Sequence, residues 1–298
     1  MALSGTKVHS LADRISRLHP CFGGEAGLNR GRVHLPVSPA CNIQCRFCKR
    51  SFNKTENRPG VTARLLTPQQ AAQLTDKALE LCPEITVVGI AGPGDTLATP
   101  HALETFRLVH RSHPELIKCL STNGLLLERY ASELRDAGIR TVTVTVNAVD
   151  PEILRYICSH VVLDGRLYKG LEAARILIGA QKRGIRRMAE LGAIVKINTV
   201  LIPDVNDFHI PEIARTAAEL GASIINIIPL IPQYEMADME APDCTQLNKA
   251  REAAEEFLPV FRHCRHCRAD ACGILGRSDL SHLLYERHQW IPETFSHG

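Results

Sequence analysis

The chain has 298 residues, of which 45% are hydrophobic and 22% are charged, the proportions of an ordinary globular enzyme. Its 35 lysines and arginines nearly balance 32 aspartates and glutamates, and the net charge of +3 excludes a polybasic nucleic-acid arm or an acidic tail as the dominant feature. No apolar run reaches the roughly 18 residues that a membrane span needs, and residues 1–17 lack the uninterrupted apolar core of a secretory signal. We therefore expect a cytoplasmic protein that binds neither nucleic acid nor a membrane.

From about residue 33, short β-branched segments alternate with longer segments of helical spacing, which is typical of parallel strands joined by crossover helices. The expected strands are residues 33–37, 85–90, 117–121, 141–146, 194–202 and 224–230. The expected helices are residues 68–81, 102–111, 126–137, 171–191, 210–220 and 246–257. Six strands are too few for a complete eight-stranded barrel, so the pattern predicts an α/β fold, a partial TIM-like (β/α)6 barrel with its functional residues at the carboxyl ends of the strands.

Local signals mark several helix ends. Thr67, Pro68 and Gln70 predict a capping box at the start of the first expected helix. Glycines just before the following strand predict helix C-termini at Gly138, Gly192 and Gly221.

Eleven cysteines need a reason other than disulfides, because the reducing cytosol keeps thiols free. Six of them lie in two clusters, Cys41, Cys45 and Cys48 after the first expected strand, and Cys264, Cys267 and Cys272 near the C-terminus. Such short spacings indicate metal ligation. Scattered cysteines such as Cys158 are expected to pack as small apolar residues.

The first cluster has the spacing Cys41-x3-Cys45-x2-Cys48. Three thiolates so spaced can hold a [4Fe–4S] cluster and leave one iron open for a substrate or cofactor. A zinc site usually takes four ligands, often as two CxxC pairs, and this spacing differs from that pattern. Three buried thiols or an ordinary zinc site are the alternative interpretations.

The segment CNIQCRFC after the first strand of a (β/α) barrel resembles the radical S-adenosylmethionine (SAM) superfamily. The resemblance implies that Cys41, Cys45 and Cys48 hold a catalytic [4Fe–4S] cluster whose open iron binds the amino and carboxylate groups of SAM. Reductive cleavage of SAM then yields a 5′-deoxyadenosyl radical. Phe47 matches the aromatic residue that the family places near the adenine.

A glycine-rich turn after the second strand agrees with a SAM site. Gly92 and Gly94 would let the backbone approach the SAM amino group closely, and Asp95 would lie near its positive charge. A plain strand–helix turn is the alternative. Further polar residues expected at strand ends, for which SAM binding and a structural role are both open, are Ser121, Asn123, Asn147 and Asn198.

A second set of potential ligands lies outside the three-cysteine loop. It comprises His19 and Cys21 before the barrel, Cys119 in the third strand, and the CxxC pair Cys264 and Cys267 after the last helix. By spacing alone the CxxC pair could hold zinc or a second iron–sulfur cluster. We expect an N-terminal extension over residues 1–32, the barrel over residues 33–260 and a cysteine-rich extension over residues 261–298, with both extensions over the barrel mouth.

Further stretches, HPCF at 19–22, RPGV at 58–61 and HCRHCRAD at 263–270, resemble the NifB family of radical SAM enzymes over nearly the whole chain. The resemblance implies that His19, Cys21, Cys119, Cys264 and Cys267 bind two further [4Fe–4S] clusters, which are substrates. One SAM would methylate a cluster sulfur, and a second would generate the radical that starts the conversion of this methyl group to a carbide. The implied activity is lyase-type: the two clusters fuse, with the carbide and extra sulfur, into the core precursor (NifB-co) of the nitrogenase FeMo-cofactor. The implied partners are an iron–sulfur cluster donor, a cofactor carrier protein and an electron donor.

Two features depart from the family pattern. Many members carry another cysteine before the RPGV segment, whereas residues 51–57 contain none. One substrate cluster is therefore expected to be held differently or more loosely, with Cys272 as a candidate substitute. The chain also ends soon after its C-terminal cysteines, so we expect the carrier to be a separate protein.

Two other functions fit part of this pattern. A radical SAM enzyme with auxiliary iron–sulfur clusters that acts on an organic small molecule or peptide would explain the cysteines, but not the HPCF and RPGV stretches. A non-catalytic iron–sulfur scaffold would not need the turn at 92–95.

Overall fold

The computed structural model describes residues 11–22 and 29–285. Within these residues, seven strands form one curved sheet in the order β11-β10-β7-β6-β5-β1-β12, parallel throughout except that β12 runs antiparallel to β1. The strands are β1 (Gly31–His34), β5 (Ile85–Ile90), β6 (Ile117–Thr122), β7 (Ile139–Thr145), β10 (Ile194–Leu201), β11 (Ile224–Pro229) and β12 (Cys272–Ile274). The first six match the six expected strands, which confirms the partial (β/α)6 barrel.

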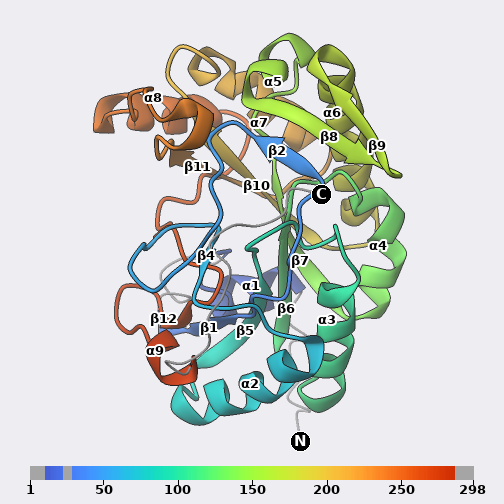
Figure 1. Cartoon of the computed structure of the whole chain (residues 1–298), viewed down its shortest axis with the longest axis vertical. Coiled ribbons are helices and arrows are strands. Elements are labelled where there is room, and N and C mark those ends of the chain that lie inside the picture. The colour runs from blue at the N-terminus through green and yellow to red at the C-terminus, as the bar shows by residue number, and fades with distance from the viewer. Residues whose placement is uncertain (1–10, 23–28, 286–298) are drawn as a thin grey trace, which may run out of the picture.

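Helices follow one another in an arc around the outside of this sheet (Figure 1). They are α2 (Pro68–Leu81), α3 (His101–Ser112), α4 (Leu127–Asp136), α6 (Gly170–Glu190), α7 (Ile210–Glu219) and α8 (Cys244–Glu255). Helix α2 begins with the expected capping box, in which Thr67 Oγ1 accepts from the Gln70 amide at 3.2 Å and Gln70 Oε1 accepts from the Thr67 amide at 3.0 Å. The glycines expected after α4, α6 and α7 have φ values of 81°, 77° and 88°, as left-handed helix ends require: Gly138, Gly192 and Gly221.

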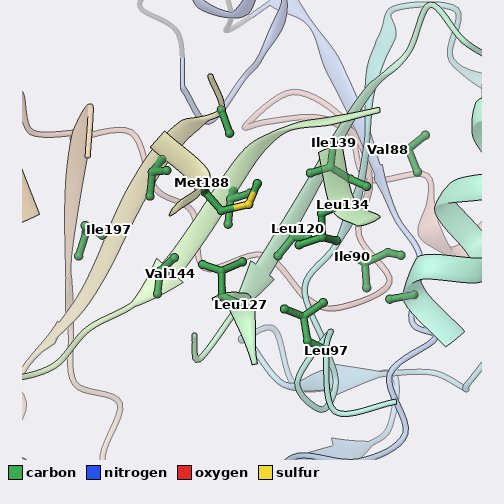
Figure 2. Packing of buried hydrophobic residues seen from close by; sticks show 14 of the residues in the cluster. Val88, Ile90, Leu97, Leu120, Leu127, Leu134, Ile139, Val144, Met188 and Ile197 are labelled. Atoms are coloured by element: carbon green, nitrogen blue, oxygen red, sulfur yellow. The ribbon is translucent and has the colours of Figure 1, made fainter. Parts of the chain in front are cut away.

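The main hydrophobic core lies between the outer face of the sheet and these helices. Figure 2 shows Leu120 and Val144 of the sheet beside Leu127 of α4 and Met188 of α6. Phe106 of α3 is fully buried in the same core. Burying one such side chain stabilises the fold by about 1.5–3 kcal/mol. The apolar side chains of the outer face therefore determine which face of the sheet packs against the helices.

Shorter elements that the sequence did not predict complete the fold. A small antiparallel sheet contains β2 (Ile43–Cys45), β8 (Cys158–Leu163) and β9 (Arg166–Lys169), and β3 (Ser51–Phe52) pairs with β4 (Val61–Thr62). The remaining helices and turns are α1 (Leu11–Leu18), α5 (Pro151–Ile157), α9 (Ser281–Leu284), η2 (Asp207–His209) and η3 (Tyr234–Met236). Among the residues described, no helix is both long and apolar enough to cross a bilayer.

Residues 15–22 of the N-terminal extension cover the barrel at the amino ends of its strands. Ile15 and Phe22 pack with Val87 and Ile117, which lie near the starts of β5 and β6. The Thr86 hydroxyl donates to the carbonyl oxygen of Leu18 at 2.5 Å. This placement differs from the expected one over the mouth, which lies at the opposite, carboxyl ends.

Residues 261–271 of the C-terminal extension run along the open side of the barrel, between β11 and β1. The Phe261 amide donates to the carbonyl oxygen of Ile225 in β11 at 2.8 Å, and the Arg268 carbonyl lies 3.0 Å from Nδ1 of His34 in β1. A six-unit barrel cannot close on itself, so its edge strands need such a cover. The far end of this segment reaches the mouth, where a Cβ atom on Gly92 in the turn after β5 would stand 3.5 Å from Ala269, and Arg268 donates to the carbonyl oxygen of Asn53 at 2.7 Å.

Candidate functional site

The inner face of the barrel carries polar side chains among apolar ones, whereas its outer face is apolar. Because side chains alternate along a strand, every second residue points inward. The residues of the five strands β5, β6, β7, β10 and β11 that line the interior at this spacing are Val87, Gly89, Cys119, Ser121, Thr143, Thr145, Lys196, Asn198, Val200, Asn226 and Ile228. The interior therefore holds a cavity in place of a packed core.

A first cavity of about 190 Å³ lies between the three-cysteine loop and the carboxyl ends of β5, β6 and β7. Cys41, Cys45 and Cys48 all line it. The loop is held in shape by Gln44, whose side-chain amide donates to the carbonyl oxygens of Cys45 and Cys48 at 2.8 and 3.1 Å. Pairing of β2 with β8 fixes its other side, with Cys45 opposite Cys158.

Electrostatics around the loop suit a bound metal cluster. Burial raises the pKa of Cys41 to about 11 and also raises the pKa values of Cys45 and Cys48, so the free thiols stay protonated at neutral pH. The guanidinium of Arg50 acts in the opposite direction at all three thiols. A bound metal cluster would displace the thiol protons. The positive charge of Arg50 would then offset part of the negative charge of the thiolates.

The donor set fits a four-iron cluster better than a single metal ion. Within residues 11–22 and 29–285, no three His, Cys, Asp or Glu side chains converge as the ligands of one ion do. A zinc ion needs such convergence, whereas each cysteine of an iron–sulfur cluster binds a different iron. The three thiols line one cavity but do not converge on one point, as the cysteines of an iron–sulfur cluster do when each binds a different iron.

The glycine-rich turn buttresses the cysteine loop from behind. The Gly94 amide donates to Ser38 and the Asp95 amide to Ala40, both to carbonyl oxygens at 2.8 Å. Gly94 and Asp95 line the cavity, whereas Gly92, with φ of 120°, stands behind them. The glycines thus allow two backbone segments to approach each other.

Asp95 is buried, and burial raises the pKa of its carboxyl group. Its oxygens accept hydrogen bonds from the Thr122 hydroxyl, at 3.0 and 3.1 Å, and from the backbone amides of Asn123 and Leu97. The carboxylate therefore ties the turn to the end of β6 and also presents a negative charge to the cavity.

The other residues expected at a SAM site divide between two cavities. Asn123 and Asn147 line the first cavity, and Phe47 and Ser121 line both. Asn198 lies in the second cavity, where its side-chain oxygen accepts from the Asn226 amide at 3.1 Å. Its assignment to SAM stays a prediction.

Two residues of the first cavity had no sequence signal. Gln181 of α6 donates to the carbonyl oxygens of Asn123 and Thr145 at 2.8 and 2.9 Å, while its buried Oε1 has no partner among the described residues. Cys158, expected to be plain core, is buried but lines the cavity beside the three cysteines. Both come from elements whose position only the fold reveals.

A second cavity of about 270 Å³ fills the barrel interior. All five residues predicted as auxiliary ligands line it: His19, Cys21, Cys119, Cys264 and Cys267. They come from the amino-end cover, from β6 and from the segment over the open side, so the fold brings together ligands that lie far apart in sequence. The two cavities share Phe47, Ala91, Ser121 and Thr145 and therefore adjoin. Cys272 lies in the hydrophobic core and does not line the cavity, so the structure does not support it as a substitute ligand.

Three more side chains line the second cavity that the sequence did not single out: Arg32, His34 and Lys196. Burial lowers the pKa of His34 to about 4, so its imidazole is neutral. Because Nδ1 of His34 must be the donor toward the Arg268 carbonyl, Nε2 carries the lone pair. Burial raises the pKa of Cys21 to about 12, and the ammonium of Lys196 acts in the opposite direction.

Comparison with known proteins agrees with this arrangement. A family model described as the radical SAM superfamily matches residues 35–217, which include the three-cysteine loop and the turn at 92–95. A crystal structure of a radical SAM methyltransferase from Sphaerobacter thermophilus aligns with a TM-score of 0.58 at 21% identity, covering 78% of this chain and 65% of that chain. The chain is a radical SAM enzyme, a class that implies a [4Fe–4S] cluster and SAM as cofactors.

Two relatives narrow the family. The chain is 48% identical over 266 residues to the FeMo cofactor biosynthesis protein NifB of Methanocaldococcus infernus, covering 89% of this chain and 88% of that protein. It is also 48% identical over 290 residues to the protein of the same name from Methanocaldococcus jannaschii, covering 95% and 96%. The chain belongs to the NifB family.

Proposed function

We propose that this chain acts in the biosynthesis of the nitrogenase FeMo-cofactor, by fusing two [4Fe–4S] substrate clusters around a SAM-derived carbide, with extra sulfur, into the core precursor. The observation that carries the proposal is the pair of adjoining cavities. One is lined by the three-cysteine loop, and the other is lined by five further ligands from three separate segments. An enzyme whose substrate is itself an iron–sulfur cluster needs both.

In this proposal Cys41, Cys45 and Cys48 hold the resident cluster, which when bound supplies the electron that cleaves SAM. Asp95 offers a carboxylate to the positively charged end of SAM, and Asn123 and Asn147 offer amide groups from neighbouring strand ends. The loop with Phe47 stands where the two cavities meet. A carbon group that leaves the first cavity therefore has a short path to the second.

The substrate clusters would be bound in two places in the interior. The Lys196 ammonium acts on the pKa of both Cys21 and Cys119, and Cys21 also lies within the electrostatic reach of Cys267 and Arg32. Cys264 and Cys267 lie on the covering segment. His34 joins His19 as a candidate nitrogen ligand, because its Nδ1 donates to the Arg268 carbonyl and its Nε2 therefore carries the lone pair. Few protein ligands per cluster would let the fused product leave.

The proposal also requires three partners: a donor of iron–sulfur clusters, a carrier for the product and an electron donor. The names of the relatives support a place in cofactor assembly. The reaction needs electrons and preformed clusters that no residue of this chain can supply.

The test is transfer of isotope-labelled methyl carbon from SAM. Anaerobic protein, loaded with iron and sulfide and given a reductant, should place the label in an iron–sulfur product that can be extracted from the protein. Cys45→Ala should abolish SAM cleavage. Cys264→Ala should leave SAM cleavage intact and stop product formation. Label found only in an organic product, or SAM left uncleaved by the wild type, would contradict the proposal.

A further inference from the structure

The interior cavity carries buried positive charge and no acidic side chain. Among the described residues that line it there is neither aspartate nor glutamate. Two of its lining residues, Lys196 and Arg32, are buried cations, with only 6% and 7% of their surfaces exposed. The adjoining SAM cavity differs, because it is lined by a buried acid, Asp95, as well as by a buried cation, Arg50.

The side chain of Lys196 projects from β10 toward aromatic rings and cysteine residues. Its ammonium lies 4.7 Å from the ring centre of Phe22 and 5.3 Å from that of Phe261, and it donates to the carbonyl oxygen of Cys21 at 3.2 Å. These contacts hold the charge in place. The thiols of Cys21 and Cys119 lie within its electrostatic reach.

Arg32 occupies the corresponding place on the other side, at β1. One of its terminal nitrogens donates to the Gly273 carbonyl at 2.7 Å, and the other donates to Sγ of Cys267 at 3.2 Å. Its Nε is buried without a partner in the described part of the chain. The guanidinium is therefore anchored by β12 and directed at Cys267, one member of the CxxC pair.

A buried cation is costly unless an anion neutralises it. Neither Lys196 nor Arg32 forms an ion pair with a carboxylate among the described residues, although the chain pairs a buried arginine, Arg268, with Asp270 at 2.8 Å elsewhere. The missing anions must therefore come from thiolates and from what they bind. Four-iron clusters with thiolate ligands are anionic. Each of the two buried cations could therefore balance the charge of one cluster and its cysteines.

We propose that Lys196 and Arg32 are positioning residues for the anionic substrate clusters, Lys196 for the one held at Cys21 and Cys119, and Arg32 for the one held at Cys264 and Cys267. This inference rests on the proposed function. It assigns one positively charged side chain to each substrate cluster. The positive charge of the cavity would then help to select anionic substrates.

The test measures how firmly the clusters are held. Wild type, Lys196→Met and Lys196→Arg are loaded anaerobically, and the release of iron to a chelator is followed together with the midpoint potential of the cluster signals. Loss of one unit charge next to a cluster should speed release of about one third of the iron by about tenfold or more and lower the potential of that cluster. Lys196→Arg should restore both values toward wild type. Arg32→Met should affect a different third of the iron.

Lys118→Met is the matched control. Lys118 is also a buried lysine, 2% exposed in β6, but it donates to the carbonyl oxygens of His113 and Pro114 and does not line the cavity. Wild-type release and potential in Lys196→Met, or an equal loss of iron in Lys118→Met, would overturn the inference. Wild-type protein that binds only one cluster would instead refute the proposed function, and the inference with it.

Discussion

Gly94 lies so close to Ala40 that a Cβ atom on Gly94 would stand 2.0 Å from the Ala40 carbonyl oxygen. The contact joins the turn after β5 to the segment that enters the three-cysteine loop. Two backbone hydrogen bonds run beside it, from Gly94 to Ser38 and from Asp95 to Ala40. The position of the loop therefore depends on the absence of one side chain.

We predict that Gly94→Ala displaces the loop, because the clash involves backbone atoms that cannot rotate away. The free energy of unfolding should fall by about 1–3 kcal/mol or more, and the iron held by the loop should be lost. Iron content and urea denaturation measure the two effects. Gly179→Ala is the control: Gly179 lies inside α6, its added Cβ would meet only the far end of Arg183 at 3.3 Å, and stability should stay or rise. A Gly94→Ala protein with normal iron would contradict this account.

Arg268 and Asp270 form an ion pair within the covering segment, and both side chains also bind the chain that follows the three-cysteine loop, Asp270 by accepting from the Thr62 hydroxyl at 3.2 Å. The two side chains are buried, and Arg268 also donates to the carbonyl oxygen of Asn53 at 2.7 Å. Removing one partner of a buried pair leaves an uncompensated charge, so Asp270→Ala should cost about 3–5 kcal/mol of unfolding free energy. Faster proteolysis within residues 261–271 should accompany it.

Arg129→Ala provides the comparison for this prediction. Asp164 pairs with Arg129 at 2.8 Å, but these side chains are 64% and 51% exposed, and a surface pair contributes only about 0–1 kcal/mol. Equal losses in the two variants would show that the buried pair has no special role.

Gln181 links the ends of β6 and β7, and its loss should weaken SAM binding. Gln181→Leu removes both donated hydrogen bonds and leaves two carbonyl oxygens without their partner, at a cost of about 1–3 kcal/mol. SAM affinity, measured by equilibrium dialysis, should fall with the same change. The exposed Gln69→Leu, which removes a surface contact to Glu104, should change neither quantity. Unchanged SAM affinity in Gln181→Leu would separate this residue from the site.

Stability of the metal-free, reduced protein should fall at alkaline pH. Burial raises the pKa of Cys158 from 9.0 to about 12. A pKa that folding raises adds stability that is complete below the unfolded pKa and is lost as the pH rises toward the folded one. The loss is about 1.4 kcal/mol for each pH unit between these two values. Cys158→Ala should therefore show a shallower fall above pH 9.0 than wild type. The exposed Cys244→Ala should keep the wild-type slope, and identical slopes in all three proteins would contradict the prediction.

The barrel could be predicted because its strands and helices carry strong local signals. The strand over Ile85–Ile90 and the helix over Pro68–Leu81 appear with the expected ends. The small sheet of β2, β8 and β9 was missed, because β2 is only three residues long and its pairing partner lies more than a hundred residues away. Local patterns do not encode such contacts.

Site residues could be predicted where the spacing of cysteines in the sequence indicates metal binding. They were missed where only the packing of the folded chain brings a side chain into the site. The cysteine loop and the CxxC pair can be recognised in the sequence by the short spacing of their cysteines. Lys196 is a single charged residue in an apolar strand, and Gln181 precedes two charged residues of a helix, so the role of each follows only from the face that the fold turns inward. Residues 15–22 lie at the amino ends of the strands and not at the mouth, because nothing in their sequence says which end of a partial barrel they cover.

The central claim is that two adjoining cavities hold iron–sulfur groups of different kinds, one resident and two as substrate. Counting iron per chain after anaerobic loading, in wild type, Cys45→Ala and Cys264→Ala, tests it most directly. We predict about twelve irons in wild type and a loss of about four in each variant, with SAM cleavage lost only in Cys45→Ala. A wild type with about four irons, or a Cys264→Ala protein with the full wild-type complement, would contradict the claim.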